Sequence, residues 1–460
     1  MTMWHPELPN STQPRYLALA DALAQAIQEG SLTPGVRLPT HRDLAERLGV
    51  TVGTVSRAYS EAERRGLIRG EVGRGTFVRK PTDTVSFGYH ATGNDVIDLS
   101  LNRPTVGQQH AEALRQAQNA ILEQARCAEL LTYQAAEGLP AHREAGAQWM
   151  RQNGVDARAD RVLVTSGGQH ALYVALAALT KPGDIVLTEK LTYPGIKSIA
   201  CQLHLSLRGL DMDAQGIVPE SLRNACRDSA RLLVCVPTLQ NPTTATMSLE
   251  RRREIAEIAI EHDIRIIEDD VYGCLVENRP PPLVTLIPER TCYLNSISKC
   301  LFPGLRVGYL LVPEDNLERY GAIIRTTMWM VAPLMAEVAT LWIRDGTADR
   351  FAQWQREAAR NGQAIAARIM GRWDYRAEPT GLHFWLTLPS PWLAGDFVQQ
   401  AKARGILTTP ASSFAVERSG IPHAVRVCVT ATDDARQLEK GLNILAELLD
   451  EAPRPGMTTI

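Results

Sequence analysis

The sequence predicts a multidomain protein in which a small module of three helices and a β-hairpin precedes a large α/β domain with a smaller α+β C-terminal subdomain. The chain has 460 residues, enough for two or three domains at about 100–200 residues each. Three helical patterns and two short β-prone runs occupy residues 1–80. Beyond residue 96, short apolar runs alternate with amphipathic stretches, as in an open, largely parallel sheet that is covered on both faces.

The composition is that of an ordinary globular protein. Hydrophobic residues make up 45% and charged residues 22% of the chain, which excludes a collagen, a disordered chain and a small disulfide scaffold. The eight cysteines form no C-x-x-C pair, and several lie in apolar runs, so we expect reduced cysteines in a cytoplasmic protein. The histidines show no metal-ligand spacing, and neither a secretory signal nor an apolar run of about 18–20 residues is visible, so we expect no metal site and no membrane segment.

The net charge of −2 is distributed unevenly. Residues 1–80 carry a net charge of +3, residues 81–460 carry −5, and the stretch 36–80 alone carries +5. A basic end on an acidic body indicates a nucleic-acid-binding module that is attached to another domain.

Three helices are expected in the N-terminal module. The first has an apolar face over residues 15–29. The second begins at Thr40, where Thr-x-x-Asp is a plausible capping box, and it stops at Gly49. The third begins near Thr51. Ala45, Gly49 and Val55 have the offsets of a helix-turn-helix, in which a small residue lets the helices approach, a glycine makes the turn and a β-branched residue fills the angle.

A hairpin is expected after the third helix. The β-prone runs 67–69 and 76–78 are joined by a glycine-rich tip from which Arg74 projects. Helix order, turn and basic hairpin together predict a winged helix-turn-helix. The alternative is a small helical subdomain with a solvated basic face.

The segment LPTHRDLAERLGVTVGTVSRAYSEAERRGLIRGEVGRGTFV resembles the DNA-reading half of GntR-type bacterial regulators, and the resemblance covers roughly residues 12–80. In that family the third helix enters the major groove of double-stranded DNA and the wing contacts the backbone or the minor groove. The resemblance therefore implies DNA contacts by Arg42, Thr51, Thr54 and Arg57 on the helices and by Arg74 and Gly75 at the wing. Taken alone, Arg57 is equally well explained as a solvated or ion-paired helix residue.

The rest of the chain divides into a linker and an α/β domain. Residues 81–95 are polar and are punctuated by glycine and proline, so we expect a linker there and a second domain over 96–460. A large subdomain is expected over about 96–330 and a small one over about 331–455. Expected strands lie at 162–165, 185–188, 232–236, 264–268, 292–295 and 307–312, with helices such as 168–180 and 249–261, and then a long helical tract at 333–371, strands near 383–388 and 424–429, and a final helix at 434–450.

Lys299 is the only one of seven lysines in a motif-like setting, NSISKCLFPGLRVGYL. A lysine amine becomes nucleophilic when partial burial and a nearby cation lower its pKa, and it then forms a Schiff base with an aldehyde. The hydroxyls of Ser296 and Ser298 and the guanidinium of Arg306 suit a phosphate. These features point to pyridoxal 5′-phosphate (PLP), which needs an amine for its aldehyde, a phosphate cup and a partner for its ring nitrogen.

Further residues supply the remaining parts of such a site. Asp269 ends an apolar strand, where open α/β sheets place ligand groups, and its carboxylate can hold the ring nitrogen protonated. Tyr272 and Asn241 can reach the ring hydroxyl, and Tyr193 can stack on the ring. Each feature also has a structural explanation, because a tyrosine before proline is usually a packed loop residue, Asn-Pro is usually a turn, and either Asp269 or Asp270 can simply end a strand.

Two more groups suit anions. Gly168 and Gln169 follow a strand and a glycine turn, so they can present a backbone amide and a side chain to the phosphate at a helix N-terminus. Arg426 lies within an apolar strand and suits a bidentate grip on a substrate carboxylate, although a strand arginine is as often a salt-bridge partner.

In this order the motifs resemble those of fold-type-I class I/II aminotransferases, across about residues 96–450. The resemblance implies active sites at a homodimer interface, with Tyr133 reaching a neighbouring subunit's phosphate. Three departures affect the positions around the substrate. Asn102 replaces the usual glycine of the substrate loop, Pro410-Ala411 replaces Pro-Gly, and Thr243-Thr244 replaces Thr-Gly.

A GntR-like reader joined to an aminotransferase-like domain is the plan of the MocR-like regulators. The resemblance implies a homodimeric transcriptional regulator that reads paired half-sites and senses PLP, or an amino compound, through aldimine chemistry at Lys299. The alternative is an active PLP-dependent aminotransferase with a secondary DNA-binding module, in which Lys299 is also the general acid/base. Slow residual transamination is compatible with either.

Overall fold

The computed structural model describes residues 4, 6, 14–33, 35–64, 67–71, 75–78, 96–124, 127–227, 230–313, 317–417 and 419–451. The chain divides into two compact units, one formed by Met1–Gly88 with Glu417–Ile421 and the other by Tyr89–Val416 with Pro422–Ile460.

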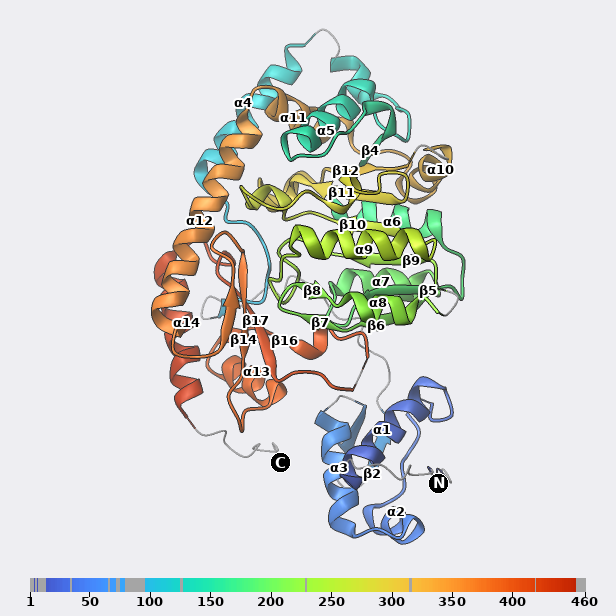
Figure 1. The fold of residues 1–460 in the computed structure, drawn as a ribbon. Coiled ribbons are helices and arrows are strands. Elements are labelled where there is room, and N and C mark those ends of the chain that lie inside the picture. The colour runs from blue at the N-terminus through green and yellow to red at the C-terminus, as the bar shows by residue number, and fades with distance from the viewer. Residues whose placement is uncertain are drawn as a thin grey trace. The chain divides into compact units, whose positions relative to one another are not determined.

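The first unit contains the predicted winged helix-turn-helix (Figure 1). The Thr40 hydroxyl accepts a hydrogen bond from the Asp43 amide at 3.2 Å, and Gly49 ends the second helix in the left-handed conformation with φ 61°. Ala45 and Val55 are buried where the two helices meet. The elements are α1 (Arg15–Gln28), α2 (His41–Leu48) and α3 (Val52–Arg64), followed by an antiparallel hairpin of β1 (Ile68–Glu71) and β2 (Gly75–Val78).

The second unit is built on a seven-stranded sheet of order β4-β12-β11-β10-β9-β5-β6. β12 is antiparallel to both of its neighbours, and every other pairing is parallel. All strands except β6 coincide with predicted runs. β6 has the sequence SLRGL and is only partly buried, so it lacks the apolar run of the others. The strands are β4 (Val162–Thr165), β5 (Ile185–Glu189), β6 (Ser206–Leu210), β9 (Leu232–Cys235), β10 (Arg265–Asp269), β11 (Thr291–Ser296) and β12 (Gly308–Leu311), and a small hairpin of β7 (Met212–Asp213) and β8 (Gly216–Ile217) lies outside the sheet.

Helices cover both faces of this sheet (Figure 1). Alternation along β9 shows the two faces, because Leu232 and Val234 belong to one core cluster and Leu233 and Cys235 to another. One face carries α6 (Gly168–Leu179), α7 (Pro194–Gln202) and α10 (Leu317–Met328). The other carries α8 (Pro219–Ala225) and α9 (Leu249–Glu261) and, beside β4, β11 and β12, α4 (Gln108–Leu122), α5 (Pro140–Gln152) and α11 (Pro333–Arg344).

A smaller antiparallel sheet of order β13-β14-β17-β16 forms the centre of the C-terminal subdomain. Its core contains Phe384, Val427 and Leu442. The elements are α12 (Thr347–Met370), β13 (Tyr375–Ala377), β14 (His383–Thr387), α13 (Ala394–Ala403), β16 (Thr409–Pro410), β17 (Ala424–Cys428) and α14 (Ala435–Asp450), and a parallel pair joins β3 (Ile97–Asp98) to β15 (Ile406–Leu407).

The tract 333–371, predicted as one long helical stretch, is two helices. α11 ends at Arg344, and Gly346 adopts a left-handed conformation with φ 77° before α12 begins at Thr347. Two segments lie on the other side of the subdomain boundary expected near residue 331. α11 was expected in the small subdomain but packs in the core of the large sheet, and β3 was expected in the large subdomain but pairs with β15 of the small one. Within the described ranges, none of the helices is both long and apolar enough to span a bilayer.

Candidate functional site

A cavity at the C-terminal ends of β9, β10 and β11 gathers most of the predicted site residues. It is lined by Asn102, Arg103, Pro104, Gly168, Gln169, Tyr193, Val236, Asn241, Asp269, Val271, Tyr272, Ser296, Ser298, Lys299, Pro303 and Arg306. Parallel strands bring their carboxyl ends to one edge of the sheet, so residues more than one hundred positions apart in sequence meet there.

Lys299 follows β11 in a single helical turn. Its Nζ donates a hydrogen bond to the carbonyl oxygen of Asn102 at 2.5 Å and lies 5.8 Å from the centre of the Tyr272 ring. Burial, and after it the positive charge of Arg426, lower the pKa of the Lys299 amine to about 8. At pH 7 roughly one tenth of the amine is then in the neutral, nucleophilic form, far more than for a lysine of ordinary pKa.

Asp269 is the last residue of β10, and 5% of its surface is exposed. Its Oδ1 accepts a hydrogen bond from the Val271 amide at 3.3 Å. Burial raises the pKa of this carboxyl group to about 7, against the opposing effects of the Val271 amide and of Lys299. A cation placed beside Asp269 would offset that cost of burial, so the site suits a protonated ring nitrogen.

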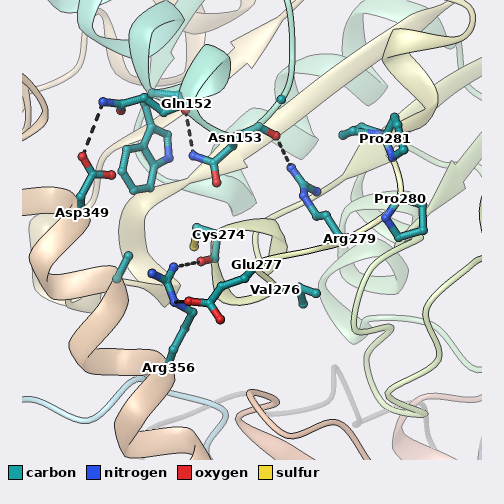
Figure 2. Close-up of a pocket in the computed structure, with 14 residues that line it drawn as sticks. Gln152, Asn153, Cys274, Val276, Glu277, Arg279, Pro280, Pro281, Asp349 and Arg356 are labelled. Carbon is teal, nitrogen blue, oxygen red and sulfur yellow. Dashed lines mark hydrogen bonds and ion pairs between the residues drawn. The ribbon is translucent and has the colours of Figure 1, made fainter.

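Asp270 faces away from this cavity. Its carboxylate accepts hydrogen bonds from the Arg279 guanidinium and, at 2.5 Å, from the Tyr293 hydroxyl. Arg279 also donates to the Asn153 carbonyl at 2.8 Å and lines a second cavity between the end of α5, the segment after β10 and α12 (Figure 2). Asp270 is thus held in a structural ion pair, which leaves Asp269 as the carboxylate of the first cavity.

Part of the cavity lining has the character of an anion site. Gly167 precedes α6 with φ 78°, and a Cβ there would lie 2.7 Å from Nη2 of Arg306. That guanidinium donates to the Ser166 carbonyl at 3.0 Å. Ser296 donates to the Ser298 hydroxyl at 3.1 Å and so places both hydroxyls together. Free amides in the first turn of a helix, an arginine and hydroxyls together suit a phosphate.

Aromatic and amide groups also line the cavity. Tyr193 and Tyr272 line it, and burial raises the pKa of Tyr193 to about 12, so this hydroxyl stays protonated. Asn241 lines it too, and its Oδ1 accepts a hydrogen bond from Nη1 of Arg426 at 2.9 Å. Arg426 is 3% exposed and lies behind Asn241, where its Nη2 donates to the Ser100 carbonyl at 2.6 Å.

Tyr133 is the one predicted cofactor residue that lies away from the cavity. Its side chain is 80% exposed, and its ring lies 5.6 Å from that of Trp329. Its expected role at a neighbouring subunit therefore stays a prediction.

The residues predicted to contact DNA lie on α2, α3 and the hairpin. Arg42, Thr51 and Arg57 are exposed and Thr54 is half-buried. Thr51 Oγ1 accepts a hydrogen bond from the Thr54 amide at 3.1 Å and so caps the start of α3. Arg74 lies outside the described residues.

Gly75 begins β2 with φ 115°, and a Cβ there would lie 2.7 Å from Nε of Arg37. Arg37 was not predicted as a site residue. Its backbone pairs with that of Phe77 in an isolated antiparallel β-bridge, which brings a further cation to the wing. No local pattern around Arg37 signals this pairing.

Several residues of the first cavity were also missed. Arg103 and Pro104 directly follow Asn102, so the motif NRP was a usable signal for them. Val236, Val271 and Pro303 are apolar or lie in loops and carry no chemical signal of their own.

Fold and site together define a class of protein, namely a winged helix-turn-helix reader combined with an aminotransferase-type PLP domain. Residues 94–445 match aminotransferase class I and II, and residues 15–78 match the bacterial regulatory proteins of the gntR family. The chain belongs to the aminotransferase class I and II family, with a GntR-type domain at its N-terminus in a MocR-like arrangement. The cofactor of this site is pyridoxal 5′-phosphate.

Similar proteins include regulators and enzymes. The chain is 32% identical over 452 residues to the uncharacterized HTH-type transcriptional regulator YdeF of Bacillus subtilis (strain 168), with 97% of each chain covered. It is 29% identical to the uncharacterized HTH-type transcriptional regulator YjiR of Escherichia coli (strain K12), over 64% of this chain and 68% of that protein. The solved structure of Pyrococcus horikoshii kynurenine aminotransferase shares the fold with a TM-score of 0.72 and 24% identity, over 77% of this chain and 91% of that one.

Proposed function

We propose that this protein is a homodimeric transcriptional regulator that binds double-stranded DNA and PLP, and that PLP or an amino compound reacting at its site changes DNA binding. The observation that carries the proposal is the presence of two well-formed sites in one chain. The reader has a capped third helix with an exposed Arg57 and, on α2, an exposed Arg42. The second unit has Lys299 and Asp269 in the lining of one cavity. The similar chain YdeF, which matches over nearly its full length, is named as an HTH-type transcriptional regulator.

The residues of the cavity fit PLP at each of its ends. Lys299 offers a partly neutral amine for the aldehyde, and Asp269 offers a buried carboxylate for the ring nitrogen. Arg306, the two serine hydroxyls and the first turn of α6 suit the phosphate. When bound, PLP supplies an aldehyde that bonds covalently to amines and a ring that withdraws electrons.

Arg426 indicates the class of the effector. The Nη atoms of this buried guanidinium donate to neutral oxygens of Asn241, Ser100 and Thr409. They can exchange those contacts for a carboxylate, which makes stronger, charge-assisted hydrogen bonds. The amine of the same ligand would then face the cofactor beside Lys299. We therefore propose an amino acid, or a similar compound with an amine and a carboxylate, as the effector.

The test is a selection of genomic DNA fragments by the full-length protein, with and without PLP and with each of a panel of amino acids. Enrichment of a discrete site, altered by PLP for the wild type and for Lys440→Ala but not for Lys299→Ala, is the expected result. Lys440 is an exposed lysine on α14 and serves as the matched control. Failure to enrich any site, together with rapid transamination of ordinary amino acids, would show instead that the chain works as an aminotransferase.

A further inference from the structure

His383 is a buried histidine to which the proposed cofactor and effector site gives no role. It begins β14, and 1% of its surface is exposed. Its Nδ1 lies 3.1 Å from Nδ2 of Asn102. An amide nitrogen only donates, so Nδ1 of His383 must accept this hydrogen bond, and the neutral ring then carries its proton on Nε2. Burial, and then the positive charge of Arg426, hold the pKa of His383 well below its usual value, in agreement with a neutral ring.

Asn102 connects this histidine to two residues of the cofactor site. Its Nδ2 also donates to the Tyr272 hydroxyl at 3.0 Å, so both amide hydrogens are used. Its backbone carbonyl oxygen accepts the hydrogen bond from Lys299 Nζ at 2.5 Å. Residue 102 therefore contacts the Tyr272 hydroxyl through its side chain and the Lys299 amine through its backbone.

His383 is well suited to fix that orientation because its own position is rigid. Its carbonyl oxygen accepts a hydrogen bond at 3.0 Å from the buried Gln363 of α12. In the small sheet it lies opposite Cys428 on the neighbouring strand, which also carries Arg426. The loop residue Asn102 is thereby tied to a packed strand of the small subdomain.

We propose that His383 is a positioning residue that, through the Asn102 side-chain amide, holds the Tyr272 hydroxyl in place for PLP and, by anchoring residue 102, keeps in position the backbone carbonyl that accepts from Lys299. The inference rests on the proposed function, because that function assigns Lys299 and Tyr272 to the cofactor. Asn102 replaces a glycine that is usual in the enzymes this chain resembles, and a glycine has no side chain to be held. With its amide hydrogens committed, Asn102 keeps its buried Oδ1 without a hydrogen-bond partner among the described atoms.

The test compares two substitutions in the full-length protein loaded with PLP. His383→Leu removes the acceptor at similar volume, whereas His383→Asn keeps a side-chain oxygen near the place of Nδ1. We expect PLP to bind about tenfold more weakly to His383→Leu. The circular dichroism of the cofactor absorption band should also fall, because the PLP ring loses a fixed orientation. The asparagine variant should return both values to within about threefold of the wild type.

A double-mutant cycle separates positioning from a general packing role. Because His383 acts through Asn102, the variant Asn102→Gly with His383→Leu should bind PLP as Asn102→Gly alone does. Wild-type PLP affinity and dichroism in His383→Leu, or losses that simply add in the double variant, would refute the inference while leaving the proposed function intact. A wild-type protein that shows no cofactor band would instead refute the proposed function itself. Thermal unfolding of the PLP-free variants identifies any that fail to fold, and Asn102→Gly, which lies in a loop, then carries the test alone through its own loss of affinity and dichroism.

Discussion

At the scale of single residues, the cofactor cavity is dominated by the cost of burying charge. Burial shifts the pKa of Lys299 down to about 8 and that of Asp269 up to about 7, so each group moves toward its neutral form. The two shifts serve different ends. A neutral lysine is the reactive form toward an aldehyde. A carboxyl group with a pKa near 7 ionises readily when a cationic ring nitrogen binds beside it.

The lowered pKa of Lys299 predicts how the rate of PLP attachment depends on pH. The amine reacts only when it is neutral, so the rate should rise about tenfold per pH unit below 8 and level off above it. A lysine with an ordinary pKa would continue to gain rate up to about pH 10. Stopped-flow absorbance between pH 6 and 9.5 measures this profile. A rate that still rises tenfold per unit between pH 8.5 and 9.5 would show that the amine is not perturbed.

Substitution of Gly167 can separate the loss of stability caused by its positive φ from a loss of phosphate binding. Gly167→Ala places a Cβ 2.7 Å from Nη2 of Arg306 and should weaken PLP binding about tenfold, because the guanidinium must move away from the start of α6. Gly183→Ala is the matched control, since Gly183 also has a positive φ (90°) but has no atom within 4 Å of the new Cβ. Both should lose about 1–2 kcal/mol of stability, measured by urea unfolding. Equal PLP affinities in the two variants would argue against an anion site at Gly167.

At the scale of elements, the sequence predicted those helices and strands that local patterns of apolar residues and caps encode. Six strands of the large sheet and the three helices of the reader follow from apolar periodicity and caps, and Thr40 and Gly49 mark the ends of α2 as expected. The order of strands, the antiparallel course of β12 and the partly exposed β6 depend on long-range pairing, which no local pattern contains.

The same distinction holds for the site. Lys299, Asp269 and Gly168 each lie in a short motif that ends a strand or begins a helix, and the structure places them in one cavity. His383 meets Asn102 across 281 positions of the chain and lies in an apolar strand, so only the fold reveals their contact. Arg37 at the wing is a similar case, because its position depends on pairing with Phe77.

The recognition helix predicts a charge-dependent loss of DNA binding. Arg57→Gln in α3 and Arg42→Gln in α2 each remove an exposed cation that is predicted to contact DNA. For each contact to a phosphate, affinity should fall about five- to tenfold, and the slope of log K against log salt concentration should become shallower by about one. Fluorescence anisotropy at several salt concentrations measures both quantities. Arg436→Gln, an exposed change on α14, is the control, and an equal effect there would mean that the reader's cations are not special.

At the scale of the whole molecule, the net charge of −2 is the sum of two unlike parts of the chain. The first 80 residues carry +3 and the remaining 380 carry −5, so attraction to DNA is concentrated in the reader while the second unit is on balance repelled. An acidic body of this kind disfavours non-specific contacts of the cofactor domain with DNA. Specific binding must then come from the readers, and one small reader makes few base contacts.

The proposed homodimer, with two readers, therefore predicts a strong preference for paired half-sites. Each reader is joined to its cofactor domain through residues 81–95, which can span at most about 50 Å. The second reader then binds intramolecularly, so a duplex with two half-sites should bind roughly 100-fold more tightly than a duplex with one. Anisotropy titrations of a selected site, with one half-site scrambled and with the spacing varied by whole helical turns, measure the ratio. Analytical ultracentrifugation should find two chains per duplex. Equal affinity for one and two half-sites, with one chain per duplex, would mean that the protein reads DNA as a monomer and that Tyr133 serves no neighbouring subunit.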